Sequence, residues 1–153
     1  MQIRIEGVDL PGSSCGPSPD RPIGHHGIHV GVQRRSRPSE LLGLTAGTAK
    51  SATWTLECTV AERATGFDLK GPYISGTPEG RFIYLSWVMM VDGTEPTMFR
   101  RAKLVLSAIP PGVIRAAMKS GSLVGRVHLT DPRGNPVCAA VKPPVIEWSA
   151  ASA

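Results

Sequence analysis

The sequence predicts a mainly β fold, an antiparallel β-sandwich or barrel of about seven to eight short strands with one short helix near residues 111–120. Apolar and polar residues alternate over several short segments, and this period of two is typical of strands. The chain also contains 17 Gly and 14 Pro among its 153 residues. These residues interrupt it at short intervals and leave room for few helices. The pattern does not decide between a sandwich and a barrel.

The segment 81–91, RFIYLSWVMMV, is predicted to be the central strand. Both of its alternating sets of residues are largely apolar, which is typical of a strand covered on both faces. Turn residues follow, and the segment 99–106 then alternates again. Its inward set is Ala102, Leu104 and Leu106, and its outward set is Arg101, Lys103 and Val105. We therefore expect a long hairpin at the centre of a sheet.

Five other segments are predicted to be strands: 2–6, 28–33, 53–60, 123–130 and 145–148. The segment 67–75 contains Gly71-Pro72, and because proline cannot donate a ladder hydrogen bond we expect an edge strand or a bulge there. A further hairpin partner is expected at 137–141. In the segment 53–60, Cys58 falls among the apolar residues and is predicted to lie in the core.

One helix is predicted over residues 110–121, with Val113, Ile114, Ala117 and Met118 on its apolar face and Gly121 at its end. Residues 38–43 have a proline near a first helical position and a terminal glycine, which suits a single helical turn.

Residues 11–27, PGSSCGPSPDRPIGHHG, are predicted to form a long irregular loop, either functional or disordered. Three of the four histidines lie at its end or just after it: His25, His26 and His29. A structural zinc site usually draws spaced pairs of ligands from two segments, whereas adjacent histidines on a loop are more often solvated. We therefore predict no metal site.

The length suits one domain, expected over residues 1–149, with a frayed tail over 150–153. Three widely spaced cysteines cannot all pair within the chain, which favours a reduced, cytoplasmic protein. The amino terminus lacks the features of a secretory signal, and no apolar run approaches the roughly 20 residues that span a bilayer. No membrane partner is expected.

Several stretches resemble a bacterial family, the domain of unknown function 5990. They are 54–58 (WTLEC), 71–73 (GPY), 81–87 (RFIYLSW), 99–104 (FRRAKL) and 129–131 (LTD), and the likeness covers nearly the whole chain. The resemblance implies a small single-domain protein, of a family represented in actinobacteria. It implies no activity and no catalytic residue. The loop with His25 and His26 is not part of the resemblance.

The sequence contains none of the common catalytic or nucleotide-binding patterns. It has no G-x-S-x-G elbow, no glycine-rich phosphate loop, and no pair of carboxylates on one strand face. No cofactor is therefore expected, and the sequence does not decide whether the protein is an enzyme.

Basic residues at the hairpin give the leading functional hypothesis. If the pairing brought Arg81 near residues 99–101, guanidinium groups would flank Tyr84 in a cavity that suits a carboxylate or phosphate. We therefore predict a small anionic ligand near the hairpin 81–106. The candidate binding residues are Arg81, Tyr84, Arg100, Arg101 and Lys103. The structural alternative is that such arginines are solvated or pair with acids such as Glu57 and Asp68.

Two other functions stay open. The first is a protein-interaction or self-association module, in which a sheet face or edge forms a homo-oligomer or docks a partner. The second is weak nucleic-acid binding, supported by the net charge of +5 and a basic cluster at 34–37. We do not favour nucleic acid, because the Trp and Phe residues are predicted to lie on apolar faces instead of among the basic residues.

Overall fold

A computed structural model of the chain describes residues 1–8, 25–38, 40–45, 51–91, 97–128 and 144–152. The side chains of residues 25–29, 45, 87–91 and 97–100 lie outside the described part. The strands are β1 (Gln2–Val8), β2 (His25–Gln33), β3 (Leu41–Thr45), β4 (Ser51–Glu57), β5 (Thr59–Arg63), β6 (Gly66–Lys70), β7 (Phe82–Val91), β8 (Thr97–Val105), β9 (Ser122–His128) and β10 (Val145–Ala150). A 3₁₀ turn, η2 (Pro78–Gly80), and the helix α1 (Pro111–Ser120) complete the described elements.

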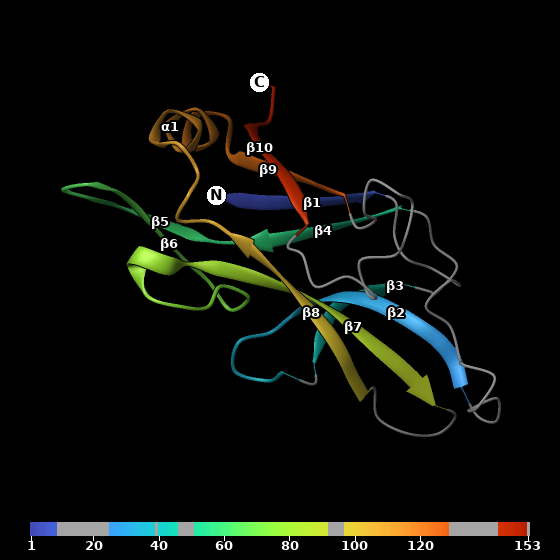
Figure 1. Ribbon diagram of the computed structural model, residues 1–153. Helices are drawn as coiled ribbons and strands as arrows, with labels where there is room; N and C mark the ends of the chain where they lie inside the picture. The colour runs from blue at the N-terminus through green and yellow to red at the C-terminus, as the bar shows by residue number, and fades with distance from the viewer. Residues whose placement is uncertain (9–24, 39, 46–50, 92–96, 129–143, 153) are drawn as a thin grey trace.

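The fold is a sandwich of two four-stranded sheets (Figure 1). One sheet has the strand order β10-β9-β1-β4, and the other has the order β3-β2-β7-β8. A separate hairpin, β5-β6, continues from the end of β4. In the described residues the sheets do not close into a barrel, so the structure decides between the two predicted architectures.

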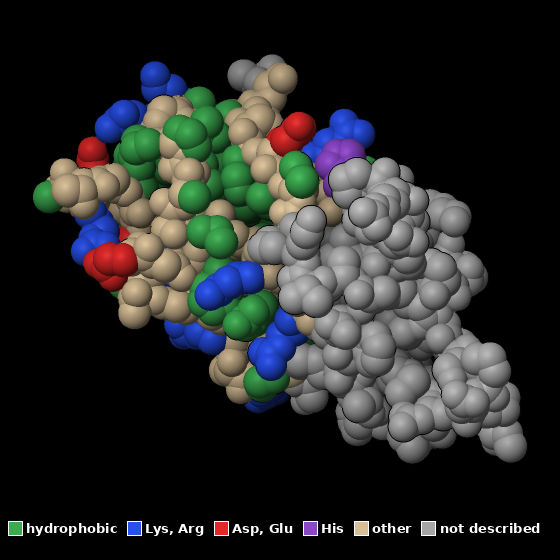
Figure 2. All heavy atoms as spheres, viewed as in Figure 1, with side chains coloured by type: hydrophobic (Ala, Val, Ile, Leu, Met, Phe, Trp, Pro, Cys, Tyr) green, Lys and Arg blue, Asp and Glu red, His purple; other side chains and the backbone are tan. Residues whose placement is uncertain are grey.

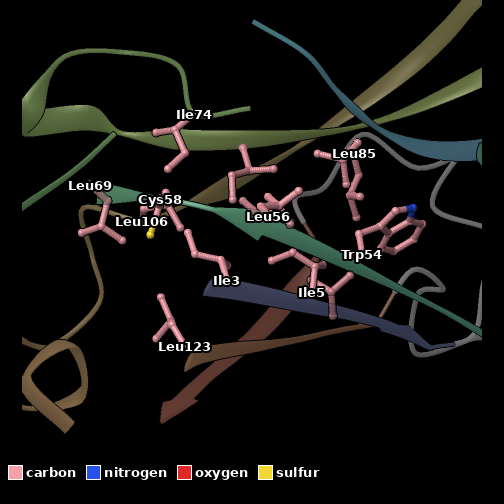
Figure 3. Close-up of a cluster of buried hydrophobic side chains, with 14 of the residues drawn as sticks. Ile3, Ile5, Trp54, Leu56, Cys58, Leu69, Ile74, Leu85, Leu106 and Leu123 are labelled. Atoms are coloured by element: carbon pink, nitrogen blue, oxygen red, sulfur yellow. The ribbon is translucent and has the colours of Figure 1, made fainter. Parts of the chain in front are cut away.

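The core lies between the sheets, as the alternating patterns predict. From one sheet, Ile3 and Leu56 are buried, and from the other Ile83, Leu85 and Leu104 are buried. Figure 3 shows residues of both sheets pointing into the same space. Burying one such side chain contributes about 1.5–3 kcal/mol relative to leaving it exposed.

The ten described strands exceed the seven to eight predicted, because some predicted segments divide and others were missed. The segment 53–60 divides at Cys58 into β4 and β5. Cys58 itself is buried in the core, which confirms its predicted position. The sheets are not wholly antiparallel, because β1 pairs with β9 in parallel. Sequence periodicity gives no strand direction, so this pairing was not predictable from it.

The predicted helix is confirmed as α1, which lies near β9 and β10 (Figure 1). Pro111 stands at its first turn, and Gly121 ends it with a left-handed φ of 81°. Ile114 and Ala117 are buried, but Met118 is 48% exposed, so its predicted place on the buried face is wrong.

The helical turn predicted at 38–43 is also wrong, because Leu41 begins the strand β3, which pairs with β2. Gly43 has a φ of +59°, and its carbonyl oxygen accepts a hydrogen bond of 2.8 Å from Trp54 Nε1. The glycine that was read as a helix stop therefore belongs to a contact between β3 and β4.

The predicted loop 11–27 and the predicted tail 150–153 also differ from expectation at their ends. Strand β2 begins at His25, so the predicted loop 11–27 is too long at its end, and residues 9–24 lie outside the described part. Strand β10 continues to Ala150, and the backbone N–H of Ala151 donates to Ser122 O at 2.9 Å. The predicted frayed tail is therefore paired over its first residues. The hairpin partner predicted at 137–141 lies outside the described residues.

The hairpin predicted from 81–106 is confirmed as β7 and β8. It is not central, however, because β8 stands at the end of its sheet's strand order. The prediction that β7 is covered on both faces is wrong for its first residues. Ile83 and Leu85 are fully buried, whereas Phe82 and Tyr84 on the other face are half-buried.

Candidate functional site

The pairing of β7 with β8 places the candidate residues on the outer face of the sheet. Tyr84 pairs with Lys103, Ser86 pairs with Arg101, and Phe82 pairs with Val105. Tyr84 and Phe82 are half-buried, while Arg101 and Lys103 are exposed. We call Phe82, Tyr84, Arg101 and Lys103 the basic–aromatic face. Over β8, Figure 2 shows basic and apolar side chains side by side.

Each cation of the basic–aromatic face lies over an aromatic ring of the neighbouring strand. Arg101 Cζ is 4.9 Å from the centre of the Tyr84 ring, and Lys103 Nζ is 4.1 Å from the centre of the Phe82 ring. The two rings contact each other edge to face, with their centres 4.7 Å apart. Such cation–π contacts contribute about 0.5–1 kcal/mol each at exposed sites. The rings therefore hold both cationic groups in place on one surface.

Within the part of the chain that the structure describes, no acidic neighbour neutralises the charges of Arg101 and Lys103. Among the described residues, neither side chain forms an ion pair with a carboxylate. By contrast, Arg34 and Arg63 do, with Glu40 at 3.0 Å and Glu79 at 3.2 Å. Two positioned cations without a counterion are the arrangement that an anionic ligand would complete.

Arg81 has a different role from the one predicted. Its Nε donates to Asp68 Oδ1 at 2.8 Å, its Nη2 donates to Asp68 Oδ2 at 3.4 Å, and its Nη1 donates to Gly76 O. The hydrogen bond from Arg81, together with its charge, lowers the pKa of Asp68 below its usual value although burial acts in the opposite direction. Arg81 therefore follows the alternative that such arginines pair with acids, because its guanidinium is bound within the fold by Asp68 and Gly76.

The hairpin register also separates the predicted arginines. Arg81 O accepts a hydrogen bond of 2.8 Å from the N–H of Leu106, whereas Arg100 pairs with Trp87 further along the strands. The expectation that pairing brings Arg81 near residues 99–101 is therefore wrong. The side chain of Arg100 lies outside the described part.

Among the cavities that described residues line are two that include neither Arg81 nor Tyr84. One, of about 600 Å³, lies where Arg35, Lys70 and Gly71 meet. The other, of about 400 Å³, lies between the β5-β6 hairpin and the start of α1. The candidate site therefore lies outside these two cavities, and a ligand cavity near the hairpin stays a prediction.

The described residues contain no group of three or more His, Cys, Asp or Glu side chains that could hold a metal ion. The side chains of His25, His26 and His29 lie outside this part, so the structure does not test the prediction about them. None of the described helices is long and apolar enough to cross a membrane.

Sequence reasoning missed Phe82 as a member of the site, although residues two apart on a strand, such as Phe82 and Tyr84, lie on the same face. It assigned the Phe residues to apolar faces, and for Phe82 this is wrong, because its ring contacts Lys103 on the outer surface. Gln33, the last residue of the predicted strand 28–33, is buried and accepts a hydrogen bond of 3.0 Å from Ser86 Oγ. This buried polar pair lies beside the basic–aromatic face on β2 and β7.

A family model matches residues 1–151 of the 153-residue chain. The chain belongs to the family of unknown function DUF5990. The match confirms the resemblance drawn from the sequence motifs. No curated protein and no solved structure matches the chain. Because the description of DUF5990 assigns no function, any role for the basic–aromatic face must rest on its geometry.

Proposed function

We propose that the basic–aromatic face binds a small anionic ligand. One observation supports this most strongly: Arg101 and Lys103 lie on the same face of β8, each over an aromatic ring, with no acidic partner among the described residues. Because the rings limit their motion, a ligand would order these long side chains at a reduced entropic cost.

The spacing of the two cations suggests the size of the ligand. Residues two apart on a strand are separated by roughly 7 Å. One phosphate, or a short molecule with two anionic ends, could therefore contact both groups. Arginine offers a planar fork for two oxygen atoms, while lysine provides a compact charge. Both side chains are exposed to water, so we expect weak binding, with a Kd of about 0.1–1 mM.

Self-association through β8 is the second candidate, because β8 ends its sheet's strand order in the described residues. An edge strand offers unpaired backbone groups to another chain. However, Arg101 and Lys103 would then bring positive charges of two copies together, and like charges across strands are unfavourable. Nucleic-acid binding is a variant of the leading proposal, in which the anionic ligand is a polymer.

We also propose a reduced, cytoplasmic setting in a bacterium. The free, buried Cys58 thiol supports the reduced setting.

An NMR titration tests the proposal. Amide spectra of the parent protein would be recorded with phosphate, pyrophosphate and succinate at constant ionic strength. We expect saturable shifts at residues 82–84 and 101–105. The variant Arg101→Gln/Lys103→Gln should lose them, whereas the control Arg115→Gln/Lys119→Gln, with the same change of charge on α1, should keep them.

Three outcomes would count against the proposal: no saturable shift in the parent, equal shifts in the parent and the Arg101→Gln/Lys103→Gln variant, or shifts spread evenly over basic surfaces. Self-association would be favoured instead if the molecular mass in solution rose with protein concentration. Reversing a charge on β8 should then lower that mass. A short single-stranded oligonucleotide in the same titration would distinguish a polymeric ligand, through cooperative binding that phosphate does not show.

A further inference from the structure

A second cavity, of about 400 Å³, lies away from the basic–aromatic face. Residues of the β5-β6 hairpin, the turn η2, the segment 106–110 and the start of α1 line it. It shares no residue with the basic–aromatic face. Its volume falls in the range of about 300–1,000 Å³ that is common for small-molecule sites.

Five apolar residues lie on the inner side of this cavity. Phe67 and Leu69 come from β6, Leu106 and Ile109 come from the segment after β8, and Ile114 comes from α1. Four of these five are buried, and Phe67 is half-buried. Because the four buried residues expose little surface, the half-buried Phe67 ring offers most of the apolar surface that a ligand can contact.

The outer wall carries a single cationic side chain among the residues that line the cavity, Arg63. Both of its terminal nitrogens donate to the same oxygen, Glu79 Oε1, at 3.2 Å. Glu79 is 71% exposed, so it reaches Arg63 from solvent. A hydrogen bond with its own backbone, and after it the hydrogen bond from Arg63, lower the pKa of Glu79, which keeps this carboxylate charged.

We infer that this cavity binds a small carboxylate with a compact apolar body, such as an aryl carboxylate. The apolar body lies against Phe67 and Ile109, and the ligand's carboxylate binds Arg63 in place of Glu79. The fork of Arg63 is not used fully by Glu79, since both bonds end on one oxygen, and a ligand with two oxygens facing the fork satisfies it better. The Glu79 carboxylate is thus a displaceable competitor.

Binding of benzoate and phenylacetate to the full chain tests this inference, with benzyl alcohol as the uncharged comparison. NMR titration should give saturable shifts at Phe67, Leu106 and Ile109 with the carboxylates and much weaker binding of the alcohol. Arg63→Met should weaken benzoate binding about tenfold or more. Glu79→Gln should tighten it, because the competing carboxylate is removed.

Matched variants make each result decisive. Lys119→Met removes the same charge from a residue of α1 that does not line the cavity, and it should leave benzoate affinity unchanged. Arg101→Gln/Lys103→Gln should also have no effect, which separates this cavity from the basic–aromatic face. Ala108→Phe, which fills the cavity, should abolish benzoate binding. Its thermal midpoint of unfolding should equal that of the parent, which shows that the variant is folded. Equal affinity for benzoate and benzyl alcohol, an unaffected Arg63→Met variant, or no shifts at the cavity would overturn the inference.

Discussion

Asp68 and Arg81 form a buried ion pair that joins the β5-β6 hairpin to the start of β7. Arg81 Nε lies 2.8 Å from Asp68 Oδ1, and the side chains of Arg81 and Asp68 are only 10% and 6% exposed. Lys70, a second cation near Asp68, is 3.6 Å away and largely exposed. The pair therefore depends on Arg81, and its role is structural.

Replacing Arg81 by Met should destabilise the fold by about 3–5 kcal/mol, because it leaves the Asp68 carboxylate buried without its main partner. The free energy of unfolding would be measured by urea denaturation. The double variant Asp68→Leu/Arg81→Met removes both charges and should recover part of the loss. Arg63→Met, which breaks an exposed pair, should change the urea midpoint little. A similarly small effect for Arg81→Met would contradict the structural role.

Acid should weaken the fold through the same pair. The pKa of Asp68 is lowered in the folded state from an ordinary value of 3.8, mainly by the hydrogen bond from Arg81. A lowered folded-state pKa means that the stabilisation is present above the unfolded-state pKa and is lost as pH falls through the folded-state pKa. Between about pH 5 and pH 2, the parent should lose more stability than Asp68→Leu/Arg81→Met. Parallel pH curves for the two proteins would show that Asp68 is not the responsible group.

Gly43→Ala should destabilise the protein by about 1–3 kcal/mol. The residue has a φ of +59°, and an added Cβ would lie 2.8 Å from Cδ1 of the buried Trp54. The control Gly112→Ala, on α1 with no atom within 4 Å of its Cβ, should be neutral or slightly stabilising. Thermal unfolding followed by tryptophan fluorescence measures both. Equal midpoints for the two variants would contradict the close contact between Gly43 and Trp54.

The Cys58 thiol should be unreactive in the folded protein. Burial raises its pKa to about 11, so only about one thiol in a thousand is ionised at pH 8. In a Cys15→Ser/Cys138→Ser variant, iodoacetamide should modify Cys58 only as fast as the protein unfolds, and urea should accelerate the reaction sharply. Rapid labelling without denaturant would contradict its burial. Because the folded-state pKa is raised, Cys58 should also reduce stability as pH rises from about 9 to about 11.

The strands and the core could be predicted from sequence because alternation records which side chains face the core. Ile3, Leu56 and Leu104 follow this rule, and so does the helix face with Ile114. Residues 38–43 could not be read correctly, since their proline and glycine suit both a helical turn and an irregular strand entry. Gly43 is explained only by Trp54, which is distant in sequence.

The site was predictable in part. Periodicity alone places Arg101 and Lys103 on one outward face, and the structure agrees. The position of Arg81 could not be predicted, because it depends on the hairpin register and on Asp68, which belongs to another hairpin. Phe82 was missed because an aromatic residue in an apolar run gives no sign that its neighbour across the strands is a lysine.

Pyrophosphate-dependent thermal stability tests the proposed anion site most directly. The temperature midpoint would be measured at fixed ionic strength for the parent, Arg101→Gln/Lys103→Gln and Arg115→Gln/Lys119→Gln. A ligand that binds only the folded state raises the midpoint, and above its Kd the increase grows with the logarithm of the ligand concentration. We predict an increase that grows with pyrophosphate concentration for the parent and the α1 control, and no increase for the β8 variant. Equal increases in all three proteins, or none in the parent, would contradict anion binding by Arg101 and Lys103.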